Sequence, residues 1–143
     1  GIRDVERCRG LGDVYKRQGH DGSMCTIHAN SPRDALSRLE TMVAMGGHDL
    51  PQSAVRQQMA SALDIIVQMQ RLPDGTRKMT CLSEVVGMEG EVVTMQDIFR
   101  YERRGVSTDG RSLGQHVATG VQPRFLEKLR AGGINLSPDL FMA

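Results

Sequence analysis

The sequence has few aromatic residues and few cysteines. Aromatic side chains make up 3% of the 143 residues, and tryptophan does not occur. Methionine occurs nine times, so we expect an aliphatic core that includes flexible thioether side chains. The three cysteines, Cys8, Cys25 and Cys81, form no CxxC pair, which argues against a disulfide framework and against a zinc site. Reduced thiols in a cytosolic protein are the simplest interpretation.

Long apolar runs and a strong charge imbalance are also missing. No run of about eighteen apolar residues occurs and the N-terminus has no apolar stretch, so neither a transmembrane segment nor an export signal is expected. The formal net charge is +1, and residues 19–143 hold thirteen basic against fourteen acidic side chains. This balance predicts no nucleic-acid partner. A hydrophobic share of 39% is enough for a folded domain.

Residues 1–18, GIRDVERCRGLGDVYKRQ, differ in character from the rest of the chain. They show neither helical nor strand periodicity and carry a net charge of +2, with five basic and three acidic side chains. The stretch resembles a translated cloning or sequencing adapter, so we expect a non-native or disordered leader. A native basic arm is the alternative. The folded part is then expected to span residues 19–143.

A short strand followed by a helix is predicted near the start of this part. In residues 23–28, SMCTIH, Cys25 and Ile27 would face one side of the strand and Thr26 and His28 the other. Residues 31–34, SPRD, supply an N-cap, a proline at the first helical position and an acid in the first turn. The predicted helix has an apolar stripe and ends at the glycine pair 46–47; the stripe consists of Ala35, Leu36, Leu39, Met42 and Val43.

The remaining elements are a second helix, a β-meander and a terminal helix. The second helix follows Pro51, with one face buried and Arg56, Gln57 and Gln58 outside; the buried residues are Val55, Met59, Ala62 and Leu63. Strands are predicted over 64–72, 77–88 and 92–103, with a turn at 73–76, a hairpin tip over 107–115 and a helix over 123–133. The expected fold class is α/β.

The stretch GHDGSMCTIHANSPRDALSRLETMV resembles the histidine box and following helix of bacterial secretion and pilus-assembly ATPases. The likeness is strongest to the CpaF/TadA type, which powers Flp (tight adherence) pilus biogenesis. It continues through RQQMASALDIIVQMQRLPDGTRKMTCLSEVVGMEGEVVTMQDIF and ATGVQPRFLEKL, and so spans residues 19–143. The resemblance implies the C-terminal portion of a RecA-like P-loop ATPase domain that assembles into a hexameric ring in the intact parent. General secretion and type IV secretion ATPases have similar boxes and are alternatives.

The same resemblance implies roles for three side chains. Thr26 and His28 would be catalytic residues that couple nucleotide state to subunit movement, and His20 and His28 would contact the bound nucleotide. ATP and Mg²⁺ would be the cofactors of the intact parent. An imidazole suits this task because it donates hydrogen bonds and can carry charge near neutral pH, where phosphoryl transfer needs charge stabilisation. The alternatives are an ordinary strand-end histidine and, with Cys25, a thiol nucleophile or metal site.

Two parts of a complete ATPase site are missing from the sequence. A phosphate-binding GxxxxGK[ST] loop needs a Gly-Lys pair, which does not occur, and no acidic strand precedes the histidine box. We therefore expect this chain alone to bind ATP weakly and not to hydrolyse it. The predicted function is that of a fragment of an ATPase for Flp/Tad pilus assembly and secretion. It would lie in the cytoplasm at the inner-membrane face, with membrane platform proteins as partners. A non-catalytic module that docks on ring or platform subunits is the alternative.

Several charged side chains have no assigned role. Arg33, Arg38 and the run RYERR (100–104) could contact nucleotide or a neighbouring subunit, but solvated charges are the default expectation. Glu84 is likewise expected to be a solvated acid at a strand end.

Overall fold

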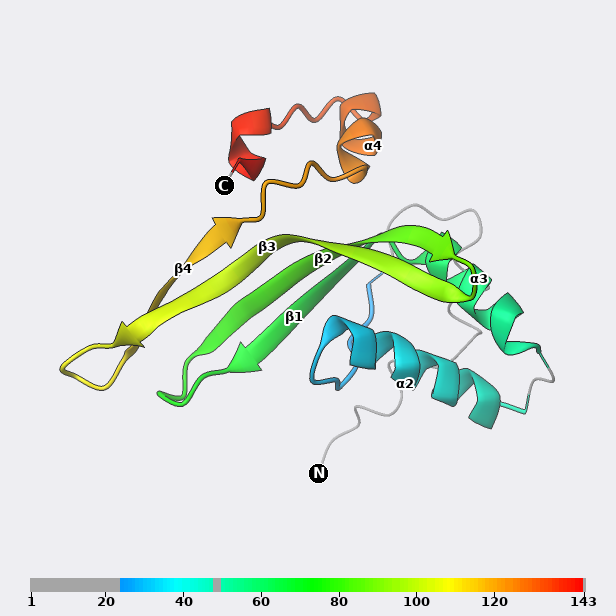
Figure 1. Ribbon diagram of the computed structural model, residues 1–143, viewed down its shortest axis with the longest axis horizontal. Coiled ribbons are helices and arrows are strands. Elements are labelled where there is room, and N and C mark those ends of the chain that lie inside the picture. Colours follow the sequence, from blue (N-terminus) through cyan, green and yellow to red (C-terminus); the bar gives the residue numbers. More distant parts are fainter. Residues whose placement is uncertain (1–23, 48–49, 143) are drawn as a thin grey trace. The chain divides into compact units, whose positions relative to one another are not determined.

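The computed structural model describes residues 24–47 and 50–142. Helices α2 (Pro32–Met45) and α3 (Gln52–Ala62) come first, and strands β1 (Ile65–Arg71), β2 (Arg77–Glu89), β3 (Val92–Val106) and β4 (Ser112–Ala118) follow. Helix α4 (Phe125–Ala131) and the 3₁₀ helix η1 (Pro138–Phe141) complete this part of the chain. The strands form one sheet in the order β1-β2-β3-β4 (Figure 1). The predicted α/β class, with two helices before an antiparallel meander and a helix after it, is confirmed.

The described chain divides into two compact units. One comprises residues 24–47, 50–63 and 87–94, and the other comprises residues 64–86 and 95–142. Helices α2 and α3 belong to the first unit together with the turn between β2 and β3. Strands β1 and β4, most of β2 and β3, and the C-terminal helices belong to the second.

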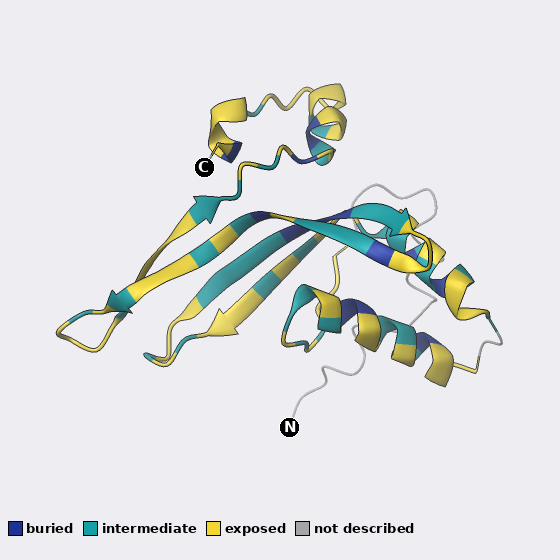
Figure 2. Ribbon diagram, viewed as in Figure 1, coloured by how far each residue is buried: buried dark blue, intermediate teal, exposed yellow. Residues whose placement is uncertain are grey.

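Helix α2 begins and ends where the sequence predicts. Ser31 has an extended backbone, and its hydroxyl accepts a hydrogen bond from the Asp34 backbone N–H at 3.1 Å. Pro32 occupies the first turn, where a missing N–H costs nothing. Gly46 and Gly47 end the helix, Gly47 with a φ of 73° that suits glycine. The buried residues follow the predicted stripe (Figure 2); they are Ala35, Leu36 and Val43.

Helix α3 buries the apolar face that its sequence predicts, but one charged residue differs from expectation. Val55 and Met59 are buried as predicted, whereas Ala62 and Leu63, also predicted on the buried face, are half-buried. The side chain of Arg56, expected outside, is 26% exposed and is hydrogen bonded to Glu40 of α2. This contact joins two helices that pack against each other. A charge pair between helices leaves no periodic signal in either helix alone.

In the second unit, tight turns set the register of the strands. The β1–β2 connection has Gly75 at a φ of 83°, as a PDGT turn predicts, and Arg71 pairs with Arg77 across it. β1 is an edge strand of the described sheet, and its exposed side chains include Ile65, Val67 and Met69. β4, which was predicted only as part of a hairpin tip, pairs with β3 from Phe99↔Ala118 to Val106↔Ser112.

The core of the second unit lies between the sheet and the C-terminal helices. Its buried members are Ile98 of β3, Leu126 of α4 and Phe141 of η1, and partly buried residues surround them: Leu82, Phe99, Val121, Phe125, Leu129 and Leu136. The ring centroids of Phe99 and Phe141 are 5.6 Å apart, a separation typical of favourable aromatic pairs. The short C-terminal helices are therefore held by apolar side chains of the strands.

Glu84 lies inside this unit, so the prediction of a solvated acid is wrong. It is 3% exposed, and its carboxylate accepts hydrogen bonds from the backbone N–H groups of Arg124 and Phe125 at 2.9 and 2.7 Å. The Gln96 amide donates to the same carboxylate at 2.7 Å. Because the first N–H groups of a helix have no partner within it, the carboxylate caps α4. This contact explains why α4 begins at Phe125, two residues after the predicted start at Pro123.

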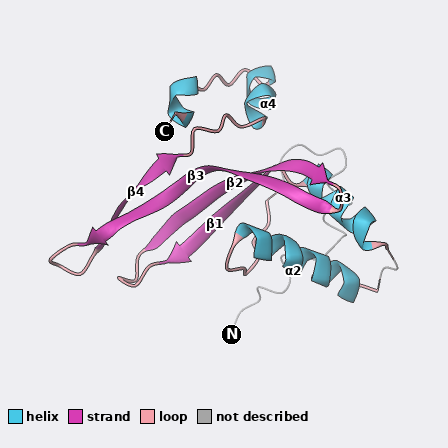
Figure 3. Ribbon diagram, in the orientation of Figure 1, coloured by secondary structure: helices cyan, strands magenta, loops and turns pink. Residues whose placement is uncertain are grey.

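The strand predicted over residues 23–28 is not formed in the described part of that range. Residues 24–29 have no regular secondary structure (Figure 3). Cys25, which was expected to share an apolar strand face with Ile27, is exposed. The cause is that a strand needs a neighbouring strand for its ladder of hydrogen bonds, and none of β1–β4 pairs with this segment. Alternation of side chains alone does not supply that partner.

Candidate functional site

The candidate site lies in the segment just before α2. Thr26 and His28 are both exposed, and His28 precedes the N-cap of the helix by three residues. The third predicted residue, His20, lies outside the described residues. The side chain of His28 is therefore open to solvent rather than sealed among aliphatic neighbours, as a group that senses a phosphate requires.

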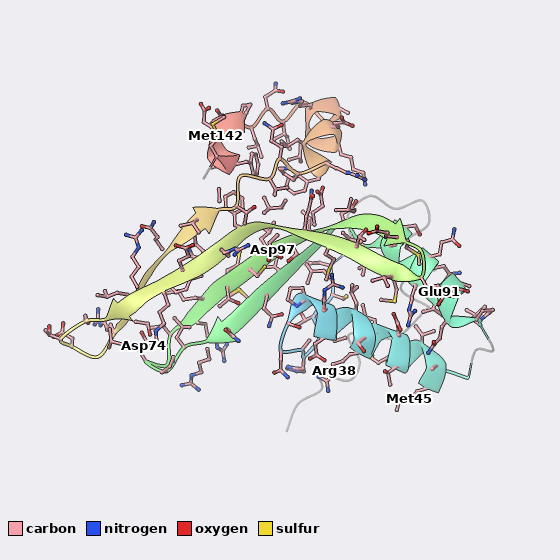
Figure 4. All side chains as sticks on the ribbon, viewed as in Figure 1. Arg38, Met45, Asp74, Glu91, Asp97 and Met142 are labelled. Carbon is pink, nitrogen blue, oxygen red and sulfur yellow. The ribbon has the colours of Figure 1, made fainter. Side chains whose placement is uncertain are left out.

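Two hydrogen bonds hold this segment against the first turns of α2. A guanidinium N–H of Arg38 donates to the backbone carbonyl of His28. The backbone N–H of Asn30 donates to Asp34 Oδ2 at 2.8 Å. The contact of Arg38 is to the main chain, so it fixes the backbone of His28 and leaves the imidazole exposed. Figure 4 labels Arg38 on the helix.

The N-terminus of α2 itself is not an open phosphate site. Helix N-termini bind anions because their N–H groups lack partners. Here the Ser31 hydroxyl already accepts the Asp34 N–H, and the Asp34 carboxylate contributes a negative charge in the same turn. A phosphate in this region would depend on side-chain donors, and His28 and Arg33 are exposed ones.

A second polar cluster lies on the sheet and involves Cys81, Ser83 and Asp97. The Ser83 hydroxyl donates to Asp97 Oδ1 at 2.7 Å, and Cys81 Sγ lies 3.2 Å from the same oxygen and 3.1 Å from Ser83 Oγ. Burial raises the pKa of the Cys81 thiol, and the Asp97 carboxylate raises it further. The thiol is therefore protonated at neutral pH, and a thiol is a poor nucleophile. This cluster is a packed hydrogen-bond network without an activated group.

The described residues do not make a complete site for ATP and Mg²⁺. Within residues 24–47 and 50–142, no three His, Cys, Asp or Glu side chains are grouped as metal binding would require. His28 and Arg33 could offer donors to a phosphate, but no glycine-rich backbone cradle accompanies them, since the sequence has no Gly-Lys pair. The nucleotide does not fit these residues alone, and we derive no hydrolysis step from them.

Sequence reasoning missed the role of Arg38. It was expected to be a solvated helix charge, yet it holds the backbone of the candidate site residue His28. The signal available in the sequence was weak, because a ten-residue separation across a helix start follows no helical spacing. An arginine that follows a short non-helical segment and a capped helix start could have suggested a hydrogen bond from Arg38 to the backbone of that segment.

Comparison with known proteins places this arrangement in a family. A model of the family described as "Type II/IV secretion system protein" matches residues 2–119. The chain belongs to this family. The resemblance to secretion ATPases is thereby confirmed at the level of the superfamily, while the boundary predicted at residue 19 stays a prediction. Among the residues that the structure describes, no helix is long and apolar enough to cross a membrane.

Individual relatives are conjugal transfer proteins. This chain is 30% identical over 95 residues to a putative conjugal transfer protein of Mycobacterium tuberculosis. The matched region is 66% of this chain and 26% of that protein. It is 36% identical over 72 residues to the conjugal transfer protein TrbB of Rhizobium radiobacter, covering 50% of this chain and 20% of TrbB. The chain thus spans between a fifth and about a quarter of the length of these two curated relatives.

Proposed function

We propose that this chain is part of a hexameric secretion ATPase that couples ATP hydrolysis to the assembly of a Flp/Tad-type pilus and to protein secretion. The family match supports a secretion-system ATPase. The finer assignment to the CpaF/TadA type rests on the resemblance of DALSRLETMV and EVVGMEGEVV to that branch. ATP and Mg²⁺ are the cofactors of the intact enzyme, and the protein acts at the cytoplasmic face of the inner membrane with platform proteins as partners.

The observation that carries this proposal is the exposed imidazole of His28 on a fixed backbone. Arg38 and the capped start of α2 hold the main chain on either side of it. A positioned donor of this kind can respond to the charge of a terminal phosphate. We assign His28 and Thr26 to the coupling of nucleotide state to movement, and His20 to the same nucleotide pocket. The bound nucleotide would supply the transferred phosphoryl group, while these side chains orient it.

A segment exchange tests the proposal. Residues 24–142 replace the matching segment in an active, full-length ATPase of the family, and ATP hydrolysis by the hybrid is measured. We expect the hybrid to hydrolyse ATP and His28→Ala to lower its kcat by about a hundredfold, as loss of a transition-state donor does. Gln57→Ala, at an exposed position of α3, is the matched control and should leave kcat unchanged. A hybrid whose rate is the same with His28→Ala would overturn the role of His28 and favour the non-catalytic module.

Conjugal transfer is a second candidate function, because the relatives named above are conjugal transfer proteins. The two candidates differ in what the ring drives. Residues 24–142 can be placed in a CpaF/TadA-type ATPase and, separately, in TrbB. Each hybrid is expressed in a strain that lacks the corresponding ATPase, and pilus assembly is measured in the first strain and plasmid transfer in the second. Rescue of pilus assembly alone supports the first candidate. Rescue of plasmid transfer alone supports the second.

A further inference from the structure

A hydrogen bond joins the tips of two hairpins in the second unit. Asp74, in the β1–β2 turn, accepts a hydrogen bond at Oδ2 from the Ser112 backbone N–H at 2.6 Å. Its Oδ1 accepts the N–H and the hydroxyl of Thr76 at 3.0 and 2.7 Å. Figure 1 shows both turns at the same end of the sheet, and Figure 4 labels Asp74 there. We call residues 69–78 and 102–113 the joined tips.

The joined tips are a basic part of the chain, and residues 1–18, with a net charge of +2, are another. The joined tips hold six basic and three acidic side chains, a net charge of +3, whereas the whole chain has +1. Five of the six basic residues are exposed, and none forms an ion pair with any residue that the structure describes. The six are Arg71, Arg77, Lys78, Arg103, Arg104 and Arg111.

Two of these basic residues are paired across the strands. Arg71 and Arg77 are directly opposite each other in the β1–β2 register. Like charges in a cross-strand pair destabilise a hairpin. An anionic surface that meets both side chains would offset this repulsion, which gives the pair a reason to be basic on both strands.

The joined tips also expose large aliphatic side chains. Met69 is 56% exposed, Val106 53% and Leu113 50%. No aromatic residue occurs in either segment. Sites for single-stranded nucleic acid stack bases on aromatic rings, and the joined tips have none to offer. Basic groups interspersed with exposed aliphatic groups are instead typical of surfaces that meet the headgroup and acyl boundary of a bilayer.

We propose that the joined tips are a docking surface for an anionic phospholipid bilayer. The arginines would meet lipid phosphates. Val106 and Leu113, which the register places on opposite faces of the β3–β4 hairpin, would both enter the boundary only if the tip inserts end-on. Charge complementarity selects the partner, because a net positive tip on a nearly neutral chain is attracted to the negative surface of a cytoplasmic leaflet. The proposal rests on the location at a membrane given under Proposed function, and it does not depend on ATP hydrolysis.

Vesicle sedimentation with the full chain tests this surface in the absence of nucleotide. We expect binding to vesicles of phosphatidylcholine with phosphatidylglycerol, little binding to phosphatidylcholine alone, and weaker binding as salt rises. The double variant Arg103→Gln/Arg104→Gln should lower the binding constant about 25-fold, since each neutralised arginine near such a surface accounts for about fivefold. The double variant Lys128→Gln/Arg130→Gln makes the same charge change at exposed positions of α4 and should bind as the parent does.

Three results would overturn the proposal. If both double variants bound the anionic vesicles equally weakly, the binding would be a general effect of net charge. If Leu113→Ser bound as tightly as the parent, the proposed contact of aliphatic side chains with the bilayer would be wrong. Tighter binding to a short DNA duplex than to the anionic vesicles would assign the surface to nucleic acid. Circular dichroism establishes that each variant is folded. Because the assay contains no nucleotide, its failure leaves the ATPase proposal standing, and an inactive hybrid enzyme would not change the vesicle result.

Discussion

Arg56 of α3 and Glu40 of α2 form a two-pronged ion pair. Arg56 Nε lies 2.9 Å from Glu40 Oε1, and Arg56 Nη2 lies 3.2 Å from Oε2. The remaining terminal nitrogen, Nη1, donates to the Glu91 carbonyl at 3.1 Å. The hydrogen bond to Glu40 and its charge raise the pKa of Arg56 above its ordinary value, so the guanidinium is charged at neutral pH. One guanidinium thus ties α2, α3 and the β2–β3 turn together.

Replacing Arg56 by lysine should weaken the first unit even though the charge is kept. A single ammonium group cannot donate to both carboxylate oxygens and to a carbonyl in a fixed plane. We expect a fall of a few degrees in the melting temperature, larger for Arg56→Ala. Thermal denaturation followed by circular dichroism measures it. Arg33→Lys, at an exposed position of α2, should leave the melting temperature unchanged. If Arg33→Lys lowered the melting temperature as much as Arg56→Lys does, the ion pair of Arg56 with both Glu40 oxygens would have no special role.

Glu84→Gln should destabilise the second unit by about 1–3 kcal/mol, the cost of leaving a buried hydrogen-bond donor unpaired. An amide has one oxygen and one NH₂ group, so it cannot accept from Gln96, Arg124 and Phe125 as the carboxylate does. Urea denaturation gives the change in the free energy of unfolding. Glu127→Gln, exposed on α4, makes the same chemical change and should have little effect. If the two variants were equally stable, the capping role of Glu84 would be wrong.

Arg38→Ala should release the segment that carries His28. The guanidinium hydrogen bond to the His28 carbonyl is lost, while α2 keeps its Ser31 cap. Hydrogen–deuterium exchange should therefore be faster over residues 24–30 and unchanged in the middle of α2. Arg33→Ala is the control on the same helix. Unchanged exchange at residues 24–30 in the Arg38 variant would contradict the anchoring role.

Acid should loosen the joined tips through Asp74. Hydrogen bonds from Ser112 and Thr76 hold the pKa of Asp74 well below its usual range. A depressed pKa in the folded state adds stability that is fully present above the ordinary aspartate pKa of about 4 and is lost as pH falls below it. Asp74→Ala should remove this part of the acid dependence and speed exchange of the Ser112 N–H at neutral pH. The parent and the variant losing stability in parallel below about pH 4 would refute this assignment.

Alkylation should distinguish Cys25 from Cys81. Cys25 is exposed, whereas burial raises the pKa of the half-buried Cys81 and so lowers its thiolate fraction. Iodoacetamide at neutral pH should label Cys25 at least tenfold faster than Cys81, as measured by mass spectrometry of the tryptic peptides. Asp97→Asn removes the neighbouring charge and should raise the rate at Cys81. Equal rates at the two thiols in the parent protein would contradict the packed polar cluster.

Local signals predicted much of the fold. Ser31, Pro32 and the glycine pair 46–47 mark the bounds of α2 because caps depend only on nearby residues. The turn at Gly75 was predictable for the same reason, since PDGT favours one backbone geometry. Elements whose bounds depend on their own residues are readable from a single sequence.

Contacts between distant residues were not predictable in this way. Glu84 meets Arg124 and Phe125 forty residues further on, and its sequence neighbourhood is that of an ordinary strand acid. The strand expected at 23–28 depends on a pairing partner that alternation does not reveal. The exposure of His28 agrees with the site that the family resemblance implies, but its role as a nucleotide contact stays a prediction.

The open edge of β1 has a practical consequence for anyone who purifies this chain. Ile65, Val67 and Met69 alternate along an edge whose outward N–H and C=O groups pair with no described strand. Such an edge is a template on which a second molecule can add its own strand, and from there fibrils can grow. We therefore expect concentrated stocks of the chain to become turbid through this strand, and Val67→Lys to reduce that aggregation by placing a charge on the edge.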